Sequence, residues 1–342
     1  MTKLFSLIIL TLLIKATPLL AQSDRIGIID FYGMPFNQIE LRKCLPFSEN
    51  DTLPFSSETA YLMGLQKIKD CLLTQKNSKQ ADIAFVCCDE QNKLIVFVGV
   101  DTTAAKPFKS TGQSDIKLPS EMKSTYDSLL NQVRIAVEKG GASENDSSGH
   151  SLMNYLPARQ LQEKFIIYAN QNVALLRDVL KNSIHDEQRQ VASAIIAYYH
   201  DKAAIVYDLL DAVSDPYESV RNNAMRAIGM IIEYSNQKPQ LKINVPADPF
   251  VNMINSIYWT DRNKSSFVLL GLTANRDIKV LDQLKQGALQ PIIDMANWKN
   301  EGHSMMGFTL LGRIAGWSDQ EITDGTKQKT ESIKKMLAQI NN

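Results

Sequence analysis

DPYESVRNNAMRAIGMI, residues 215–231, is the stretch of sequence that decides the fold. Its opening Asp-Pro pair marks a turn, because proline fixes φ and cannot continue a preceding helix. Val220, Ala224 and Ile228 then recur at intervals of four residues, which is the spacing of one face of an α-helix. The stretch therefore predicts a turn followed by a helix that packs its apolar face against a neighbour.

The same pattern recurs along the C-terminal half. Four positions mark its register, and these are Arg189, Arg221, Arg262 and His303, at intervals of 32, 41 and 41 residues. Such intervals are typical of helical-pair repeats with loop insertions. Residues 215–231 also resemble the HEAT-repeat consensus, in which Asp-Pro turns the chain and Val-Arg opens the inner helix. The resemblance implies an all-α HEAT-repeat solenoid over residues 173–342, with a helical cap at residues 119–172.

The N-terminal segment predicts a different architecture. Apolar β-rich runs at residues 26–33, 83–88 and 94–100 read as strands, and residues 37–45 and 62–72 have helical spacing. The order β-α-α-β-β resembles a POTRA domain. That resemblance implies a docking module, which can add a strand of a partner protein to the edge of its sheet. The predicted fold class is therefore α+β, a small POTRA-like domain followed by the solenoid.

Polar, breaker-rich residues 103–118 are typical of a linker, so the N-terminal domain is predicted at residues 22–102. The mature chain is also similar to a family of exported bacterial HEAT-repeat proteins. IDFYG, LPFSEND and VCCDEQNKLIVFVGVD, which begin at residues 29, 45 and 86, carry this similarity together with the terminal array. It implies architecture and transfers no catalytic residue.

Residues 1–21 predict export. Lys3 precedes the apolar run 4–14 and a small residue stands at Ala21, as in a secretory signal that is cleaved there. The run is too short to span a bilayer, which takes about 20 apolar residues, and no later stretch is long enough. We therefore expect a periplasmic or secreted protein without an integral membrane span.

The balanced net charge of the chain argues against nucleic acid as a partner. The sequence has 37 basic and 37 acidic residues, so it offers no electrostatic reason to bind nucleic acid. Hydrophobic residues make up 44% and charged residues 22%, which is ordinary for a folded globular chain.

Four cysteines lie in the N-terminal segment, and an even number in an exported chain permits disulfides. Cys44, Cys71, Cys87 and Cys88 allow three pairings. Their spacing matches no zinc knuckle. Buried free thiols and a single disulfide both remain open as interpretations.

Polar residues on the second helices are the candidate partner-binding set. They are Arg221, Asn222, Asn223, Arg226, Arg262, Asn263, Lys264 and His303. In HEAT arrays these helices line the concave face, where Arg recognises carboxylates and Asn pairs with peptide groups. The alternative is structural, because Arg and Asp at such positions bond between adjacent repeats as a ladder. We expect Arg226 and Lys264 to be exposed surface residues.

The sequence lacks a nucleophile elbow, a zinc-protease pair and a phosphate-binding glycine loop, so no cofactor or metal is predicted. Glu144, Asp146 and His150 could offer metal ligands within one loop, although their spacing is not diagnostic. The predicted function is a non-catalytic scaffold that associates with bacterial envelope complexes. It would bind a protein or peptide through the concave face, and the sheet edge is a second surface. The alternative is a metal-dependent enzyme that uses the loop Glu144–His150.

The register predicts a severe effect of a charge at position 224. We expect Ala224→Asp to lower the free energy of unfolding by more than about 2 kcal/mol, because it buries an unpaired charge between helices. Chemical denaturation followed by circular dichroism measures this loss. An unchanged unfolding curve would show that the register is wrong.

Overall fold

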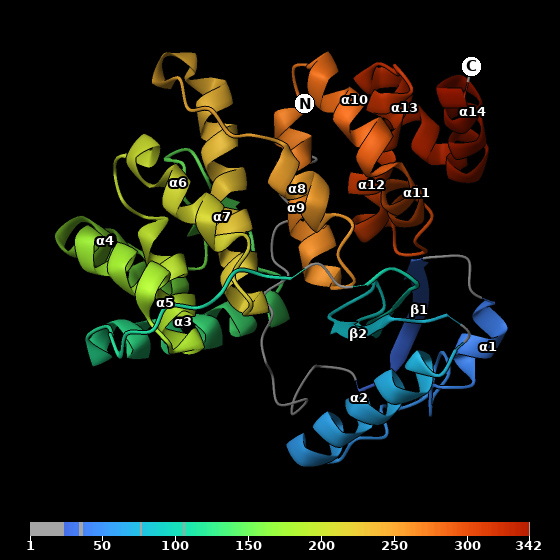
Figure 1. The fold of residues 1–342 in the computed structure, drawn as a ribbon, viewed down its shortest axis with the longest axis horizontal. Helices are drawn as coiled ribbons and strands as arrows, with labels where there is room; N and C mark the ends of the chain where they lie inside the picture. Colours follow the sequence, from blue (N-terminus) through green and yellow to red (C-terminus); the bar gives the residue numbers. More distant parts are fainter. Residues whose placement is uncertain (1–23, 34–36, 76, 105–106, 342) are drawn as a thin grey trace. The chain divides into compact units, whose positions relative to one another are not determined.

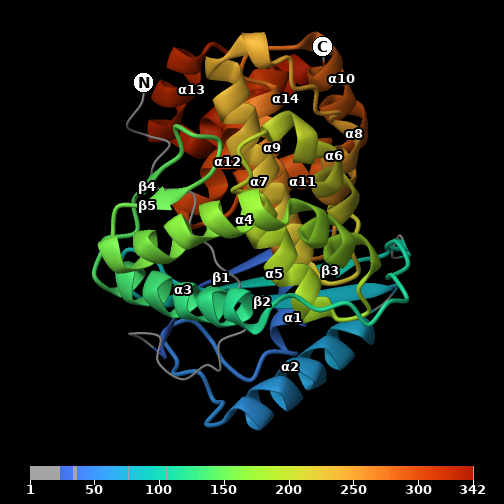
Figure 2. The same cartoon turned by 90° about the vertical axis from the view of Figure 1, so that its left-hand side faces the viewer.

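The computed structural model describes residues 24–33, 37–75, 77–104 and 107–341, so the predicted leader lies outside the described residues. The chain divides into two compact units. One unit (unit 1) comprises residues 107–249, and the other (unit 2) combines residues 24–104 with residues 250–342. Figures 1 and 2 show the ribbon from two directions. Within the described residues, no helix combines the length and the apolar composition that crossing a membrane requires.

Unit 2 begins with the predicted order of strands and helices. The elements are β1 (Ile26–Gly33), α1 (Gln38–Arg42), α2 (Glu58–Leu73), β2 (Gln80–Val86) and β3 (Leu94–Asp101). The strands form one sheet in the order β1-β3-β2, in which β1 pairs with β3 in parallel and β2 pairs with β3 in antiparallel orientation. The central strand β3 is buried almost throughout, as its continuous apolar run LIVFVGV requires.

The two faces of this sheet pack against different partners. On one face, Val96 and Val98 belong to a core that includes Ile68 and Leu72 of α2. Phe97 points to the other face, because successive strand residues alternate. There its ring lies 5.2 Å from that of Trp259 and 4.7 Å from that of Trp298, between ring centroids. The sheet therefore shares a core with the last helices of the chain.

Those last helices complete unit 2. They are α8 (Asp248–Met253), α9 (Trp259–Leu272), α10 (Ile278–Gly287), α11 (Leu289–Ala296), α12 (Glu301–Ile314), α13 (Asp319–Gly325) and α14 (Lys329–Asn341). Helix α12 packs against α9 and α11. The sequence analysis assigned residues 22–102 and 173–342 to separate domains. The compact unit instead joins the sheet to residues 250–342, because Phe97, Trp259 and Trp298 bury one another. Independent folding of the predicted domains stays a prediction.

Unit 1 is helical. Its elements are α3 (Ser120–Glu138), β4 (Glu144–Asn145), β5 (Leu152–Met153), α4 (Leu156–Asn182), α5 (Asp186–Ile196), α6 (Lys202–Ala212), α7 (Glu218–Gln237) and the short 3-10 turn η2 (Pro239–Leu241). Asn172 has a non-helical φ of −131° inside α4, at the residue where the cap was predicted to end. Helices α4, α5, α6 and α7 pack as successive neighbours, and α3 lies along α4 and α5 (Figure 2).

Residues 107–118 run along unit 1. Ser114 N donates to Asn182 O at 2.9 Å, and Ile184 N donates to Ser114 O at 3.0 Å. Ser183 Oγ donates to Ile116 O at 2.7 Å. Gly112 permits this close approach, since an added Cβ would lie 2.0 Å from Asn182 O. Residues 107–118 of the predicted linker are therefore part of the unit 1 fold.

The repeat register holds for three of the four predicted positions. Arg189, Arg221 and Arg262 are each the fourth residue after the N-cap, and each donates to the carbonyl oxygen six residues before it. His303 is the third residue after its N-cap Asn300, so Ser304 occupies the equivalent place. The mismatch arises because the N-caps Tyr258 and Asn300 lie 42 residues apart, one residue more than the interval between Arg262 and His303.

Arg189 joins two repeats of unit 1. Its Nε lies 2.8 Å from Asp215 Oδ2 and its Nη2 lies 3.1 Å from Asp215 Oδ1. Both side chains are almost completely buried, at 2% and 0% exposure. This is the inter-repeat ladder that was the structural alternative for the arginines.

Loss of Asp215 should therefore be costly. We expect Asp215→Ala to lower the free energy of unfolding by about 3–5 kcal/mol, because Arg189 is left as an unpaired buried charge. Asp211→Ala is the matched control, since Asp211 is exposed and pairs with Lys109 at the surface. The control should cost less than about 1 kcal/mol. Equal losses in urea denaturation would rule out the ladder.

Trypsin tests how residues 107–118 are held. Lys109 N donates to Ser214 O at 3.0 Å, and the neighbouring segment is bonded to the helix ends. We expect trypsin to cleave after Lys109 and Lys117 no faster than unit 1 unfolds, because cleavage needs a locally released backbone. Rapid cleavage at these sites, leaving a folded fragment from Pro119, would support the separate predicted domains.

Candidate functional site

A cavity of about 70 Å³ lies in unit 1, on the side of α5 and α7 that faces α3. We call this side the inner face. Apolar side chains of α3, α4, α5 and α7 form most of the lining. The polar lining includes Asn222, Asn223 and Arg226 from the predicted set, and Glu144 and His150 from the loop before α4. The structure thus brings three predicted residues together with the loop of the metal-enzyme alternative.

Arg226 is paired inside this cavity. Its Nη2 lies 2.5 Å from each carboxylate oxygen of Glu144 and 3.2 Å from Ser151 Oγ. The side chains are 26% and 6% exposed. Burial lowers the pKa of Arg226, but the charge and hydrogen bond of Glu144, together with Tyr198 and Tyr126, raise it above its ordinary value. Arg226 is therefore paired with a carboxylate of the same chain, and recognition of a partner's carboxylate stays a prediction.

Tyr126 of α3 connects to both inner helices. Gln190 Nε2 of α5 donates to its hydroxyl at 3.0 Å, and Asn223 Nδ2 of α7 donates to it at 3.4 Å. The neighbouring Asn222 is 4% exposed, and its Oδ1 has no hydrogen-bond partner among the described residues. An unsatisfied buried carbonyl oxygen at the cavity wall is an acceptor for a bound donor group.

Backbone groups of residues 150–153 of the loop form hydrogen bonds with side chains of unit 1. Tyr198 donates its hydroxyl to Ser151 O at 2.9 Å, and Met153 N donates to Gln162 Oε1 at 2.7 Å. Gln162 of α4 and Tyr198, which follows the end of α5, therefore hold residues 151–153 of the loop by hydrogen bonds to peptide groups. Sequence reasoning missed this contact, because it depends on which loop crosses the helices.

His150 and Lys202 form a buried basic pair. Lys202 Nζ donates to His150 Nδ1 at 3.0 Å and to the carbonyl oxygens of Ala197 and Tyr199 at 2.7 and 2.8 Å. Burial and the nearby Lys202 charge lower the pKa of His150 to about 4. Burial also lowers the pKa of Lys202 to about 7.

The loop does not gather metal ligands. Glu144 faces Arg226, whereas His150 faces Lys202. Across the described residues, no group of three or more His, Cys, Asp or Glu side chains is placed to hold a metal ion. The geometry therefore gives the metal-enzyme alternative no ligand set at this loop.

The remaining predicted residues do not extend the cavity. Arg221 is fully buried, and its guanidinium carbon lies 4.0 Å from the centre of the Phe108 ring. In unit 2, Arg262 lies 4.6 Å over the ring of Tyr32. His303 packs edge-on against Phe97 and Trp259, and burial lowers its pKa to about 4. Asn263 and Lys264 are 2% and 3% exposed.

The expectation that Arg226 and Lys264 are surface residues is therefore wrong. Elements that precede the repeats in sequence cover the inner side of each unit: α3 and the loop in unit 1, and the sheet in unit 2. A polar residue on an inner helix signals exposure only when nothing packs on that helix. Partner binding by these residues stays a prediction.

A second opening was not predicted. A cleft of about 490 Å³ lies in unit 2 between α2 and the loop 44–55. Its lining is formed by Cys44, Pro46, Pro54, Phe55, Ala60, Met63, Gly64, Lys67 and Ile68. We call it the α2 cleft. Leu62 was placed on the apolar face of this helix from its spacing, yet it is 58% exposed, beside Met63 at 57%. In the sequence, the neighbouring apolar residues at positions 62 and 63 were the feature that could have indicated an exposed apolar surface on this helix.

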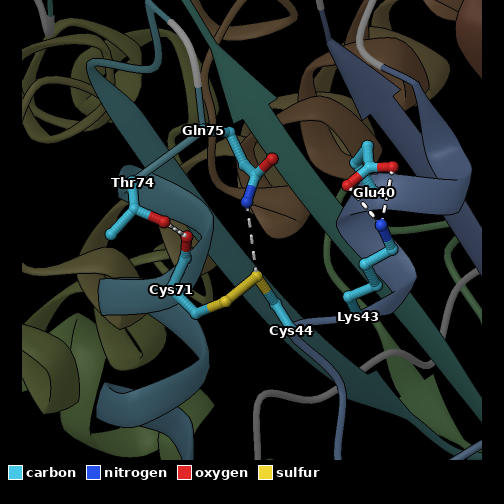
Figure 3. Close-up of a disulfide and its surroundings, with 6 residues drawn as sticks. All are labelled: Glu40, Lys43, Cys44, Cys71, Thr74 and Gln75. Atoms are coloured by element: carbon cyan, nitrogen blue, oxygen red, sulfur yellow. Dashed lines mark hydrogen bonds and ion pairs between the residues drawn. A yellow bond between two sulfur atoms is a disulfide. The ribbon is translucent and has the colours of Figure 1, made fainter.

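A disulfide joins the two walls of the α2 cleft. Cys44 and Cys71 are bonded with a Cα–Cα distance of 5.5 Å, and Gln75 Nε2 approaches Cys44 Sγ at 3.7 Å (Figure 3). Cys87 and Cys88 form the second disulfide. These pairs select one of the three possible pairings, and the interpretation as free thiols is wrong.

Acid should weaken the loop. The unfolded state binds the His150 proton near pH 6.5 and the folded state near pH 4. Stability is therefore lost as the pH falls through this window, by at most about 1.4 kcal/mol per pH unit for one proton. We expect His150→Gln to flatten the pH dependence of the unfolding free energy. A proton NMR titration that places the pKa of His150 at 6.5 or above would contradict this expectation.

Comparison with known proteins gives structural matches alone. No known protein family matches the sequence, and no curated protein matches it. A designed armadillo repeat protein, YIII(Dq)4CqI, is 14% identical with a TM-score of 0.36, over 57% of this chain and 98% of its own. Another, YIII(Dq.V1)4CPAF, in complex with the peptide (KR)4, is 15% identical with a TM-score of 0.37, over 64% of this chain and 99% of its own. At such TM-scores neither match carries an argument about function.

Proposed function

We propose that this protein is a non-catalytic scaffold that binds a protein or peptide partner through the inner face of unit 1. One observation carries the proposal: this face already binds a short β-hairpin, residues 143–154 of the same chain. It does so with one carboxylate pair, between Arg226 and Glu144, and with side-chain bonds to peptide groups. These are the interactions by which grooves recognise peptides.

A partner segment would take the place of residues 143–154. These residues form only a two-residue strand pair, in which Glu144 is opposite Met153 and Asn145 is opposite Leu152. A carboxylate of the partner would bind Arg226 in place of Glu144. A donor group of the partner would also satisfy Asn222 Oδ1, which the internal segment leaves unpaired. The proposed partner is thus a polypeptide segment with an acidic side chain.

The proposed location is the bacterial envelope, in the periplasm or outside the cell. The support comes from the leader-like residues 1–21 in the sequence and from the disulfides Cys44–Cys71 and Cys87–Cys88. Disulfides persist in oxidising compartments. The POTRA-like reading of residues 24–102 belongs to the same proposal.

The sheet edge is the second proposed surface, and we place it at β2. The outer edge of β1 is already bonded, because Ile26 N donates to Asp51 O at 2.9 Å and Lys299 Nζ donates to Ile29 O at 3.0 Å. A partner strand would therefore extend the sheet beside β2.

Charge reversal tests the inner face. We expect Arg226→Gln to abolish the co-purification of a specific partner from envelope extract, and Glu144→Gln to increase it by freeing Arg226. The double variant Glu144→Arg with Arg226→Glu is the control, since it keeps an internal ion pair. It should fold but lose an acidic partner. Melting curves verify that each variant is folded.

If the double variant still captures the partner, the inner face is not the binding surface. The edge of β2 then becomes the proposed binding surface. Elemental analysis of the purified protein tests the enzyme alternative. Stoichiometric zinc or calcium that is lost on His150→Ala would favour a metal-dependent enzyme over the scaffold.

A further inference from the structure

The α2 cleft is an opening with fixed walls. Its volume is about 490 Å³, within the range of about 300–1,000 Å³ that small-molecule sites occupy. Pro46, Pro54 and Phe55 form one wall, and one side of α2 forms the other. All of its lining residues belong to unit 2.

Two contacts hold the loop against α2. The Cys44–Cys71 disulfide ties the start of the loop to the last turns of the helix. At the other end, Phe55 lies directly on Gly64, because a Cβ added there would be 2.0 Å from the Phe55 ring. The ring of Phe55 also packs edge-on against Tyr61 at 5.8 Å. The loop that forms one wall is therefore attached to α2 by the disulfide and by the Phe55 contacts.

The chemistry of the lining is apolar with a single cation. Met63 is 57% exposed at the cleft, which leaves an apolar side chain in water. Lys67 is the one charged residue of the lining, and it has no ion pair or hydrogen bond to any described residue. Two other lysines of residues 24–104 are paired: Lys43 lies 2.7 Å from Glu40 and Lys69 lies 2.6 Å from Asp82.

We propose that the α2 cleft binds a long-chain carboxylate, with its hydrocarbon chain along Met63 and Phe55 and its carboxylate on the Lys67 ammonium. Burial of the chain drives binding, because apolar surface of both partners leaves water. The ion pair selects an anionic end and fixes the direction in which the chain enters. This site is separate from the inner face, so it goes beyond the proposed scaffold function.

Amphiphiles of graded length and charge test the site on the whole protein. We expect dodecanoate, below its micellar concentration, to bind once per chain in isothermal titration calorimetry. Decanoate lacks two methylenes and should bind about 4- to 15-fold more weakly, given roughly two- to fourfold for each methylene. Dodecanol lacks the charge and should bind about two- to fivefold more weakly than dodecanoate.

Three variants locate the binding. Lys67→Met should lower the affinity for dodecanoate to that for dodecanol and leave dodecanol unchanged. Ala60→Trp should abolish the binding of both, because the ring fills the cleft. Lys79→Met is the matched control, a lysine of the same module outside the lining, and it should bind dodecanoate like the unsubstituted protein. Melting curves confirm that all three variants are folded.

Methyl NMR of Met63 supplies an independent readout, since its signal should shift on binding of dodecanoate and stay unshifted in Ala60→Trp. Binding at many weak sites, or dodecanoate affinity that survives both Lys67→Met and Ala60→Trp, would overturn the proposal. An apolar peptide with a free C-terminal carboxylate that binds the cleft where dodecanoate does not would overturn it as well. Arg226→Gln should leave dodecanoate binding intact, which separates this result from the scaffold test.

Discussion

The buried pair of Arg189 and Asp215 sets the geometry on which the repeats of unit 1 depend. The guanidinium group bonds both carboxylate oxygens of the next turn and the carbonyl oxygen of Ser183 in its own turn. A buried charge is tolerated only when such partners surround it. The pair therefore fixes the distance between two turns, and with it the way in which α5 packs against α7. Arg221 repeats the bond to its own turn at Asp215 O, so each inner helix begins in the same way.

The same requirement explains why the inner face is covered. Inner helices rich in Arg and Asn present more donors than their own turns can accept. In unit 1 the surplus is met by Glu144, Ser151 and Tyr126, which belong to the loop and to α3. A partner that binds this face has to replace those bonds, since a buried group that loses its partner costs about 1–3 kcal/mol. Under the proposed function, this cost favours partner segments that carry a carboxylate and free peptide groups.

In unit 2 the packing depends on apolar contacts that bury both faces of the sheet. Its sheet is apolar on both faces, with Val98 directed to α2 and Phe97 to the tryptophans of α9 and the turn before α12. Among the described residues, Leu62 and Met63 on the outer surface of α2 remain exposed. The disulfide between Cys44 and Cys71 holds the loop beside that surface. The result is an apolar cleft, in contrast with the polar inner face of unit 1.

The sequence by itself determined the elements and their order, because helical spacing, strand runs and turn residues act over a few neighbours. The turn at Asp215-Pro216, the helix from Val220 and the β-α-α-β-β order all follow from such local signals. The arginine at the fourth helical position was also visible, and its structural role was the alternative kept beside partner binding. Tertiary structure alone decided that Glu144 lies on Arg226, that Phe97 joins Trp259 and Trp298, and that Leu62 is exposed. Residues 144 and 226, and residues 97 and 298, are far apart in the chain. Their contacts depend on which surfaces cover one another, and no local pattern encodes that choice.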